Sequence, residues 1–235
     1  MYSSAFCRVY DAFGWNVYPE VFGEQLLRWL ETKGIRVRRS LDLGCGTGVL
    51  CALLAAQGVR AVGADLSASM IDIARSRAPE LEFVQADMVT WRPEGPFDLV
   101  TCTGDALNHV FDPEDVSRVF ENVRACLSPG GWCVFDLLNE AEVPPGEPFE
   151  LDWSDAVRAR FLTTREADGA VNLSVAVYEN GALKFEENIR EKVHPVDDVL
   201  QRLARAGFRV EQCADRLLLE GDNHGTTWFI AARAA

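Results

Sequence analysis

The feature that most constrains this chain is the stretch LDLGCGTGVL, which runs from Leu41 to Leu50. It is typical of an apolar strand that turns directly into a helix, with Gly44, Gly46 and Gly48 between the two. Glycine has no Cβ, so the backbone can turn tightly there and a ligand can come close to the main chain. The stretch therefore predicts a ligand-binding turn between a strand and a helix.

Predicted strands and helices alternate around this turn, which favours a parallel sheet with helices on both faces. We expect strands at 39–43, 60–64, 81–86, 97–102 and 132–138, and helices at 17–33, 49–57, 67–77 and 113–127. An SPGG turn at 128–131 is expected to join the last of these helices to the last strand. Ser67 and Asp112 are the expected N-caps of the last two helices.

The alternation breaks after Leu138, where residues 139–149 are expected to form a loop. Three β-leaning runs follow, at 156–164, 171–179 and 182–193, and the dipeptides Asp168-Gly169 and Asn180-Gly181 between them favour hairpins. A helix at 195–206 and strands at 208–213 and 226–232 complete the chain. We therefore expect one domain from residues 1–138 and 194–235, with 1–34 as a helical cap, and an antiparallel insertion at 139–193.

The spacing of the glycines bears on the ligand. A dinucleotide fingerprint would be G-x-G-x-x-G, but this chain has G-x-G-x-G with valine at position 49, and no GK[ST] follows. No Lys or Arg occurs between Ser40 and Val59, while Asp42 directly precedes the glycines. A pyrophosphate would meet a carboxylate without a cation. A ligand that carries an ammonium and a sulfonium would find that carboxylate favourable.

Two further acids follow the next strands. Asp65 stands 21 residues after Gly44, where a carboxylate can accept both ribose hydroxyls, although a helix N-cap is the alternative role. Asp87, in QADM, can accept from an exocyclic adenine amine while Met88 packs on the ring. Ligands of open α/β sheets bind at the carboxyl ends of the strands, so the three acids predict one nucleoside site.

These motifs resemble class I S-adenosylmethionine-dependent methyltransferases of the type 11/25-like, small-molecule branch. The similar pieces are LDLGCGTG, GADLS, FVQADM, FDLVTCTGDALNHV and LSPGGWCVFDL, and the layout is similar to that of sugar-amine N-methyltransferases. The resemblance implies a Rossmann-like, doubly wound seven-stranded sheet whose last strand is antiparallel, with a helical cap and an antiparallel insertion that covers the acceptor site. It implies S-adenosyl-L-methionine as the cofactor.

The resemblance also implies which residues touch the cofactor. The expected set is Tyr10, Asp42, Gly44, Gly46, Gly48, Asp65, Leu66, Met70, Asp87, Met88 and Cys102. Tyr10, together with Tyr18, would reach the methionine end, with ordinary packing in the cap as the alternative.

Methyl transfer needs alignment of the acceptor more than it needs a base, because the leaving group comes with the cofactor. His109 and Asp105, after the fourth strand, are the predicted catalytic residues, with Asn108 as another positioning group. His109 could instead pack or cap the next helix. The remaining histidines, His194 and His224, are expected to be structural or solvated. The aromatics that could line an acceptor pocket, or serve as core, are Trp132, Trp153, Phe161, Tyr178 and Phe185.

Composition narrows the partners. The chain has 23 Lys and Arg against 36 Asp and Glu, a net charge of −13, which disfavours nucleic acid or an anionic membrane as a partner. Seven cysteines without a CxxC pair or a metal-ligand spacing fit a reducing cytoplasm and predict no metal site. No signal peptide or membrane span is expected. The sequence leaves a homodimer open.

The function expected from the sequence is transfer of a methyl group to an N or O atom of a small molecule. Two alternatives remain at this point: a cofactor-binding regulatory or partner subunit without turnover, and a nicotinamide-dependent oxidoreductase, which the glycine spacing disfavours.

Overall fold

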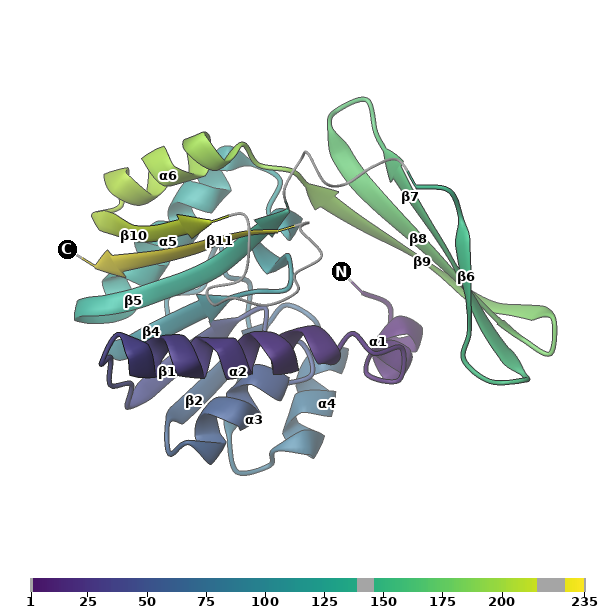
Figure 1. Cartoon of the computed structure of the whole chain (residues 1–235), viewed down its shortest axis with the longest axis horizontal. Helices are drawn as coiled ribbons and strands as arrows, with labels where there is room; N and C mark the ends of the chain where they lie inside the picture. The colour runs from purple at the N-terminus through teal and green to yellow at the C-terminus, as the bar shows by residue number, and fades with distance from the viewer. Residues whose placement is uncertain (1, 139–145, 215–226, 235) are drawn as a thin grey trace.

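The computed structural model of the chain describes residues 2–138, 146–214 and 227–234. Its central sheet has seven strands in the order β10-β11-β5-β4-β1-β2-β3 (Figure 1). The strands are β1 (Arg39–Leu43), β2 (Arg60–Asp65), β3 (Glu82–Gln85), β4 (Phe97–Cys102), β5 (Leu127–Leu138), β10 (Phe208–Ala214) and β11 (Thr227–Ala234). β11 runs antiparallel to both neighbours, whereas β1 to β5 pair in parallel. The predicted seven-stranded sheet with an antiparallel last strand is confirmed.

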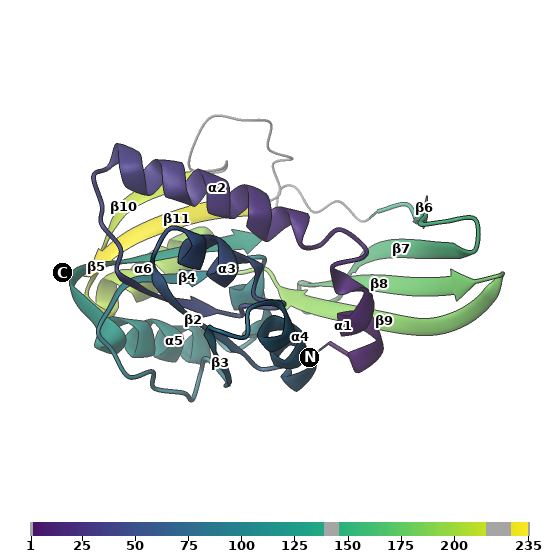
Figure 2. The same cartoon turned by 90° about the horizontal axis from the view of Figure 1, so that it is seen from below.

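Helices cover both faces of this sheet (Figure 2). One face packs against α2 (Val17–Thr32), α3 (Val49–Ala56) and α4 (Ala68–Arg77), and the other against α5 (Pro113–Cys126) and α6 (Val196–Arg205). Side chains of a strand alternate between the faces. Leu99 accordingly packs with α2 and α3, while the next residue, Val100, packs with α5. The predicted N-caps are present, since Ser67 accepts from the N–H of Met70 and Asp112 from that of Glu114.

The predicted SPGG turn is wrong, because residues 128–131 belong to β5. Gly130 adopts a φ of +72°, and the register between β4 and β5 shifts between Phe97 and Leu99. A glycine with positive φ lets the strand absorb this irregularity and continue in the sheet. The strand therefore begins five residues earlier than the sequence suggested.

The insertion is a separate antiparallel sheet in the order β6-β7-β8-β9. Its strands are β6 (Phe149–Asp152), β7 (Val157–Arg165), β8 (Ala170–Glu179) and β9 (Ala182–Lys192). The three hairpin strands were expected, whereas β6 was not. β6 forms at the edge because Phe149 stacks on Phe161 of β7, with ring centroids 4.7 Å apart.

The short helix α1 (Ser4–Tyr10) contacts α4, which covers the central sheet, and β9 of the insertion sheet (Figures 1 and 2). The Ser3 N–H donates to Glu187 of β9 at 3.1 Å, and the Ser69 hydroxyl of α4 donates to that of Ser4. Phe6 is fully buried among the inner residues of the insertion sheet. α1 thus links the insertion to the central domain.

Six of the seven cysteines are buried and Cys213, on β10, is exposed; none forms a disulfide. Among the described residues, no helix combines the length and apolarity that crossing a membrane requires. The same residues hold no group of three or more metal-ligating side chains.

Candidate functional site

The glycine turn lies between β1 and α3, at the carboxyl end of the sheet. Its start is fixed to β2, since the N–H groups of Gly44 and Cys45 both donate to the carbonyl of Ala64. A Cβ added at Gly44 would stand 2.5 Å from the Cβ of Ala106, whereas one added at Gly46 would meet nothing within 4 Å. Packing thus requires glycine at position 44, while Gly46 borders open space where a ligand can approach the backbone.

Asp65 is the last residue of β2 and contacts this turn directly. Its Oδ2 accepts the N–H of Gly46 at 2.9 Å, and its Oδ1 accepts that of Ser67 at 2.8 Å. Burial raises the pKa of Asp65, and these backbone donors oppose the rise. Each carboxylate oxygen can accept a second bond. The ribose role therefore stays a prediction that this geometry accommodates, and the helix-capping role belongs to Ser67.

The residues around Asp65 differ in how they can meet a ligand. Leu66 is 47 % exposed beside the turn, so its side chain is available to a cofactor. Met70 and Cys102 are buried in the protein interior. Direct contact with a cofactor stays a prediction for both.

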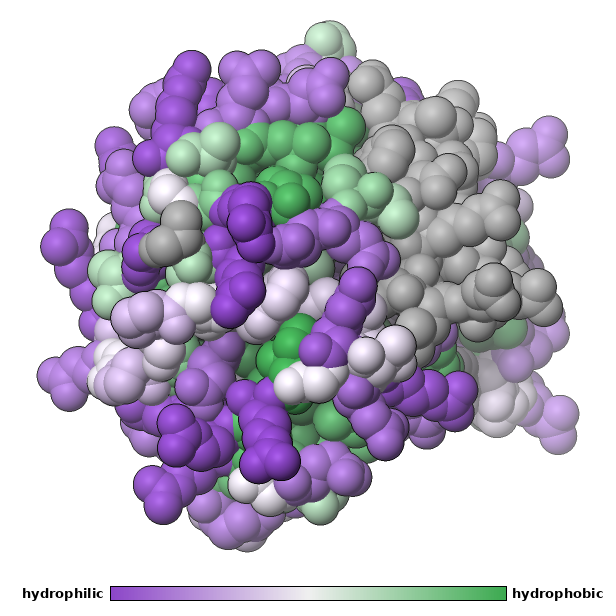
Figure 3. Space-filling model, turned by 60° about the vertical axis from the view of Figure 1, so that its left-hand side comes forward, coloured by the Kyte–Doolittle hydropathy of each residue, from purple (hydrophilic) through white to green (hydrophobic). Residues whose placement is uncertain are grey.

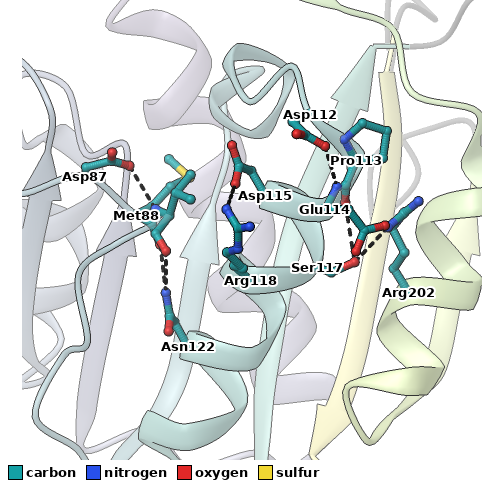
Figure 4. Close-up of polar contacts among 11 residues, drawn as sticks. Asp87, Met88, Asp112, Pro113, Glu114, Asp115, Ser117, Arg118, Asn122 and Arg202 are labelled. Carbon is teal, nitrogen blue, oxygen red and sulfur yellow. Dashed lines mark hydrogen bonds and ion pairs between the residues drawn. The ribbon is translucent and has the colours of Figure 1, made fainter.

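Asp87 and Met88 lie in the turn after β3 (Figure 4). Asp87 Oδ1 accepts the N–H of Val89 at 2.9 Å, and the Asn122 side chain donates to the carbonyls of Met88 and Val89. Met88 Cε lies 3.8 Å from the place where a Cβ on Gly44 would stand. Asn122 thus holds the turn after β3 next to the glycine turn, and the packing of Met88 on adenine stays a prediction.

Asp42 lies under the glycine turn and is 5 % exposed. Its Oδ1 accepts the Thr101 hydroxyl at 2.7 Å. Burial raises the pKa of this carboxyl to about 7, and the charges of Asp65 and Asp136 add to the rise. The structure therefore gives Asp42 a protein partner, and its predicted effect on a cationic cofactor would act through space.

Asp136, on β5, is a site residue that sequence reasoning missed. It is fully buried, and it accepts from the N–H groups of Gly104 (2.8 Å) and Asp105 (3.0 Å) and from the Tyr18 hydroxyl. Burial raises its pKa to about 6. Asp136 holds the loop after β4, in which Asp105 takes a left-handed φ of +58° that is unusual for a residue with a Cβ. The available signal was a single acid within the apolar run WCVFDLL.

Asp105 and Glu191 bring two more carboxyls to this loop. Glu191 comes from β9 of the insertion and was also missed from the sequence. Burial raises the pKa of Glu191 to about 7. The pKa of Asp105 is raised well above its ordinary value, mainly by burial and then by the charges of Asp136 and Glu191. Three carboxyls from three elements therefore share one neighbourhood.

His109 stands beside this acidic group. Its Nδ1 lies 3.3 Å from the carbonyl of Arg190, which can only accept, so Nδ1 carries the proton in the neutral ring. Nε2 then accepts from the Tyr2 hydroxyl at 3.2 Å. The same Nε2 lies 3.7 Å from Glu191 Oε1. Burial lowers the pKa of His109, which favours the neutral ring. Its role as a base stays a prediction. Capping of α5 is done by Asp112 instead.

Asn108 does not fit its predicted positioning role. It is fully buried, its Nδ2 donates to the carbonyl of Lys192 at 2.7 Å, and its Oδ1 accepts the N–H of Leu138 at 3.2 Å. The side chain ties the end of β9 to the end of β5. His194 is likewise structural, since its Nε2 lies 2.8 Å from the carbonyl of Val110, and His224 lies outside the described residues.

Tyr10, from α1, is within reach of the charges of both the predicted ribose acid and the acidic group. After burial, the charges of Asp105 and then Asp65 contribute most to raising its pKa. Its ring stacks on Trp15 at 5.5 Å. The two halves of the predicted site are therefore adjacent, and α1 walls both.

Comparison with known proteins agrees with this geometry. Residues 41–131 match a family described as "Methyltransferase domain". The chain is also 29 % identical, over 219 residues, to the putative methyltransferase YqeM of Bacillus subtilis. The match covers 87 % of this chain and 88 % of YqeM. The segment 41–131 is therefore similar to a methyltransferase domain. Further curated relatives match the chain over about half of their own length, 42 to 50 % in two of them.

Solved structures share the fold. An S-adenosylmethionine-dependent methyltransferase from Clostridium acetobutylicum superimposes with a TM-score of 0.83 at 20 % identity, over 97 % of each chain. CalS10, an amino pentose methyltransferase from Micromonospora echinaspora, does so with a TM-score of 0.79 at 20 % identity, over 100 % of this chain and 98 % of that one. The predicted Rossmann-like fold is confirmed, and S-adenosylmethionine stays the predicted cofactor.

The residues present fit S-adenosylmethionine. Open space at Gly46 admits a ligand to the backbone, and the Asp65 oxygens beside it have acceptor capacity left for two hydroxyls. The cofactor's positive charge would lie among carboxyls. The oxidoreductase alternative has no support in the family match.

Proposed function

We propose that this protein transfers the methyl group of S-adenosylmethionine, by in-line displacement, to the nitrogen of a small-molecule amine. One observation supports the proposal: three carboxyls lie near the loop after β4, where Asp136 accepts the Asp105 N–H at 3.0 Å and Glu191 lies 3.7 Å from His109. Carboxylates close to an ammonium stabilise it, and the cost of their mutual repulsion falls when a cation lies among them. A hydroxyl acceptor would gain less from such a group.

The cofactor supplies an activated methyl whose leaving group departs with it. Glu191 and Asp105 would bind the ammonium and turn it toward the methyl. An amine attacks only through its lone pair, so a proton must leave first. Glu191, whose pKa is raised to about 7, can take that proton near neutral pH. His109 would hold Tyr2 in place by accepting its hydroxyl, and α1 and the insertion would exclude water.

The surroundings support a small acceptor. Tyr2 and Tyr10 of the N-terminal segment and β9 of the insertion border the acidic group, which leaves it walled by protein. The fold shared with an amino pentose methyltransferase is consistent with an amine. We further propose that the domain boundaries are those stated from the sequence. We also propose that the chain acts in the cytoplasm, can form a homodimer, and has neither nucleic acid nor a membrane as a partner.

The test is a transfer assay with methyl-labelled S-adenosylmethionine and a panel of primary amines, each paired with the alcohol of the same skeleton. We expect transfer to amines and much less to their alcohols. Glu191→Gln should raise KM for the amine about tenfold and leave the affinity for S-adenosylhomocysteine unchanged. Glu186→Gln, on the exposed side of the same strand, is the matched control. Equal rates for amines and alcohols, or an unaffected Glu191→Gln variant, would refute the proposal.

A further inference from the structure

A recess opens at the end of the central sheet that lies opposite the glycine turn. Residues 33–36 precede β1, residues 128–132 lie at the start of β5, residues 209–212 lie early in β10, and Arg233 lies near the end of the antiparallel β11. Figure 3 turns this end of the molecule toward the viewer, and hydrophilic side chains line much of it. The proposed methyl transfer uses none of these residues.

The recess consists of two adjoining cavities, of about 180 and 380 Å³. Lys33, Trp132 and Arg233 line both cavities, so the two lie side by side. The larger cavity falls within the range of about 300–1,000 Å³ that is usual for small-molecule sites. A ligand of modest size therefore fits this space.

A row of three side chains across β5, β11 and β10 forms the floor of the recess. Arg233 pairs with Trp132 and with Arg209, and directly paired residues point to the same side of a sheet. Trp132 packs edge-on against Trp29 of α2, with ring centroids 5.0 Å apart. The Trp29 indole N–H donates to Gln212 Oε1 at 3.1 Å, which joins α2 to β10. Strand pairing and α2 thus fix the shape of the floor.

Positive charge gathers around this space, although the chain as a whole is acidic. The lining includes four cationic side chains, Lys33, Arg36, Arg209 and Arg233, and two acidic ones, Asp98 and Glu211.

Both acids already have donors. Asp98 Oδ2 accepts the N–H groups of Arg38 and Arg39 at 2.8 and 3.1 Å, and Glu211 pairs with Arg209. Within the part of the chain that the structure describes, no acid forms an ion pair with the other three cations of the lining. Since the net charge of −13 repels anions in general, an anion that binds here must gain from these three side chains.

Gly130 holds the Arg233 guanidinium at the recess. Arg233 Nε donates to the Gly130 carbonyl at 3.2 Å, and a Cβ added at Gly130 would stand 3.1 Å from Nη2 of Arg233. The guanidinium carbon lies 5.9 Å from the centre of the Trp132 ring. The terminal nitrogens of a guanidinium donate in a fork that matches an oxyanion, and Ser128, which lines the larger cavity, adds a hydroxyl donor.

We propose that this recess is a second small-molecule site, which binds a phosphate ester with an aromatic or apolar body. The phosphate lies among Lys33, Arg36 and Arg233, and the organic part lies against Trp132. A phosphate carries a charge of about −1.5 to −2 at neutral pH, so three cations stabilise it more than they stabilise a single carboxylate. An indole ring offers a large apolar contact to the organic part.

Calorimetry with inorganic phosphate, phenyl phosphate and phenol tests this site. Each probe is titrated into the full chain with and without saturating S-adenosylhomocysteine. We expect phenyl phosphate to bind about tenfold more tightly than inorganic phosphate, with the same affinity in both conditions, and phenol to show no measurable binding. Added NaCl should weaken phenyl phosphate, because salt screens exposed charges.

Two variants and a control locate the binding. Arg36→Gln and Arg233→Gln should each weaken phenyl phosphate about fivefold, because each removes a charged donor. They should leave the circular dichroism spectrum and the affinity for S-adenosylhomocysteine unchanged. Arg28→Gln is the matched control, since Arg28 is exposed on α2 and lines neither cavity. It removes the same charge from a neighbouring position and should keep the wild-type affinity.

Several results would overturn the inference. They are no binding of phenyl phosphate, its displacement by S-adenosylhomocysteine, and an equal loss in Arg28→Gln and Arg36→Gln. Phenyl phosphate that binds no more tightly than inorganic phosphate would refute the contact with Trp132. Binding of poly-glutamate without binding of phenyl phosphate would assign the surface to an acidic protein partner instead.

Discussion

Replacing Asp42 by asparagine should make the folded protein more stable and weaken its hold on the cofactor. The Asp42 carboxyl is 5 % exposed, and burial raises its pKa from an ordinary 3.8 to about 7. An asparagine oxygen can still accept the Thr101 hydroxyl, which now lies 2.7 Å from Oδ1. The substitution therefore removes a buried charge and keeps its principal hydrogen bond.

The magnitude follows from the pKa. Because the folded-state pKa exceeds the unfolded value, the folded state binds more protons between pH 3.8 and 7, and stability falls as the pH rises through that window. The rise is about 3 pH units, at about 1.36 kcal/mol each, so the wild type loses on the order of 4 kcal/mol above pH 7. The asparagine variant escapes this loss. Its advantage should be near zero at pH 4 and largest above pH 7.

Urea unfolding of both proteins between pH 5.5 and 8.5 measures this difference. Calorimetry with S-adenosylmethionine over the same range should show weaker binding by the variant, because the cofactor's positive charge loses a nearby carboxylate. A constant stability difference across the range would refute the reasoning from burial. An unchanged cofactor affinity would show that Asp42 is structural only.

The other predictions concern the glycine turn and the two halves of the site. Gly44→Ala should destabilise the protein by about 3 kcal/mol in urea unfolding, because the residue has a φ of +72° and the new Cβ would overlap Ala106. Gly46→Ala should cost only about 1 kcal/mol of backbone strain and should mainly weaken cofactor binding. Asp65→Ala should raise the dissociation constant of S-adenosylhomocysteine, measured by calorimetry, at least tenfold, which is about 1.4 kcal/mol. Asp72→Ala, at an exposed position, should leave that constant unchanged. Equal dissociation constants for Asp65→Ala and the wild type would assign Asp65 a capping role instead. His109→Ala should lower the transfer rate by more than it lowers cofactor affinity, and full activity would remove it from the mechanism.

Most of the fold could be predicted because the elements have strong local signals. The strand periodicity and the caps at Ser67 and Asp112 depend on neighbouring residues, and they placed the central elements within a few positions. β6 has only four residues, and its pairing depends on Phe161, which lies 12 positions after its partner Phe149. Such a strand is defined by tertiary packing, which local patterns do not contain.

The predicted cofactor half of the site has clearer signals in the sequence than the acceptor half. The glycines, Asp65 and Asp87 follow strand ends, and parallel strands bring those ends to one edge. Asp136 belongs to an apolar strand, and Glu191 is one charge among several in EENIREK, so the alternation alone does not show which of them faces the site. The pairing of β9 with β8, and the packing of α1 against it, decide that Glu191 points inward.

The distribution of cysteines makes the unmodified chain suitable for site-specific labelling. Cys213 is the exposed thiol, while the other six are buried, and burial raises the pKa of Cys45, Cys51 and Cys102 well above the usual range. A maleimide dye in mildly alkaline buffer should therefore attach to β10 alone. The dye would then mark the edge strand β10 of the central sheet without any substitution near the predicted site.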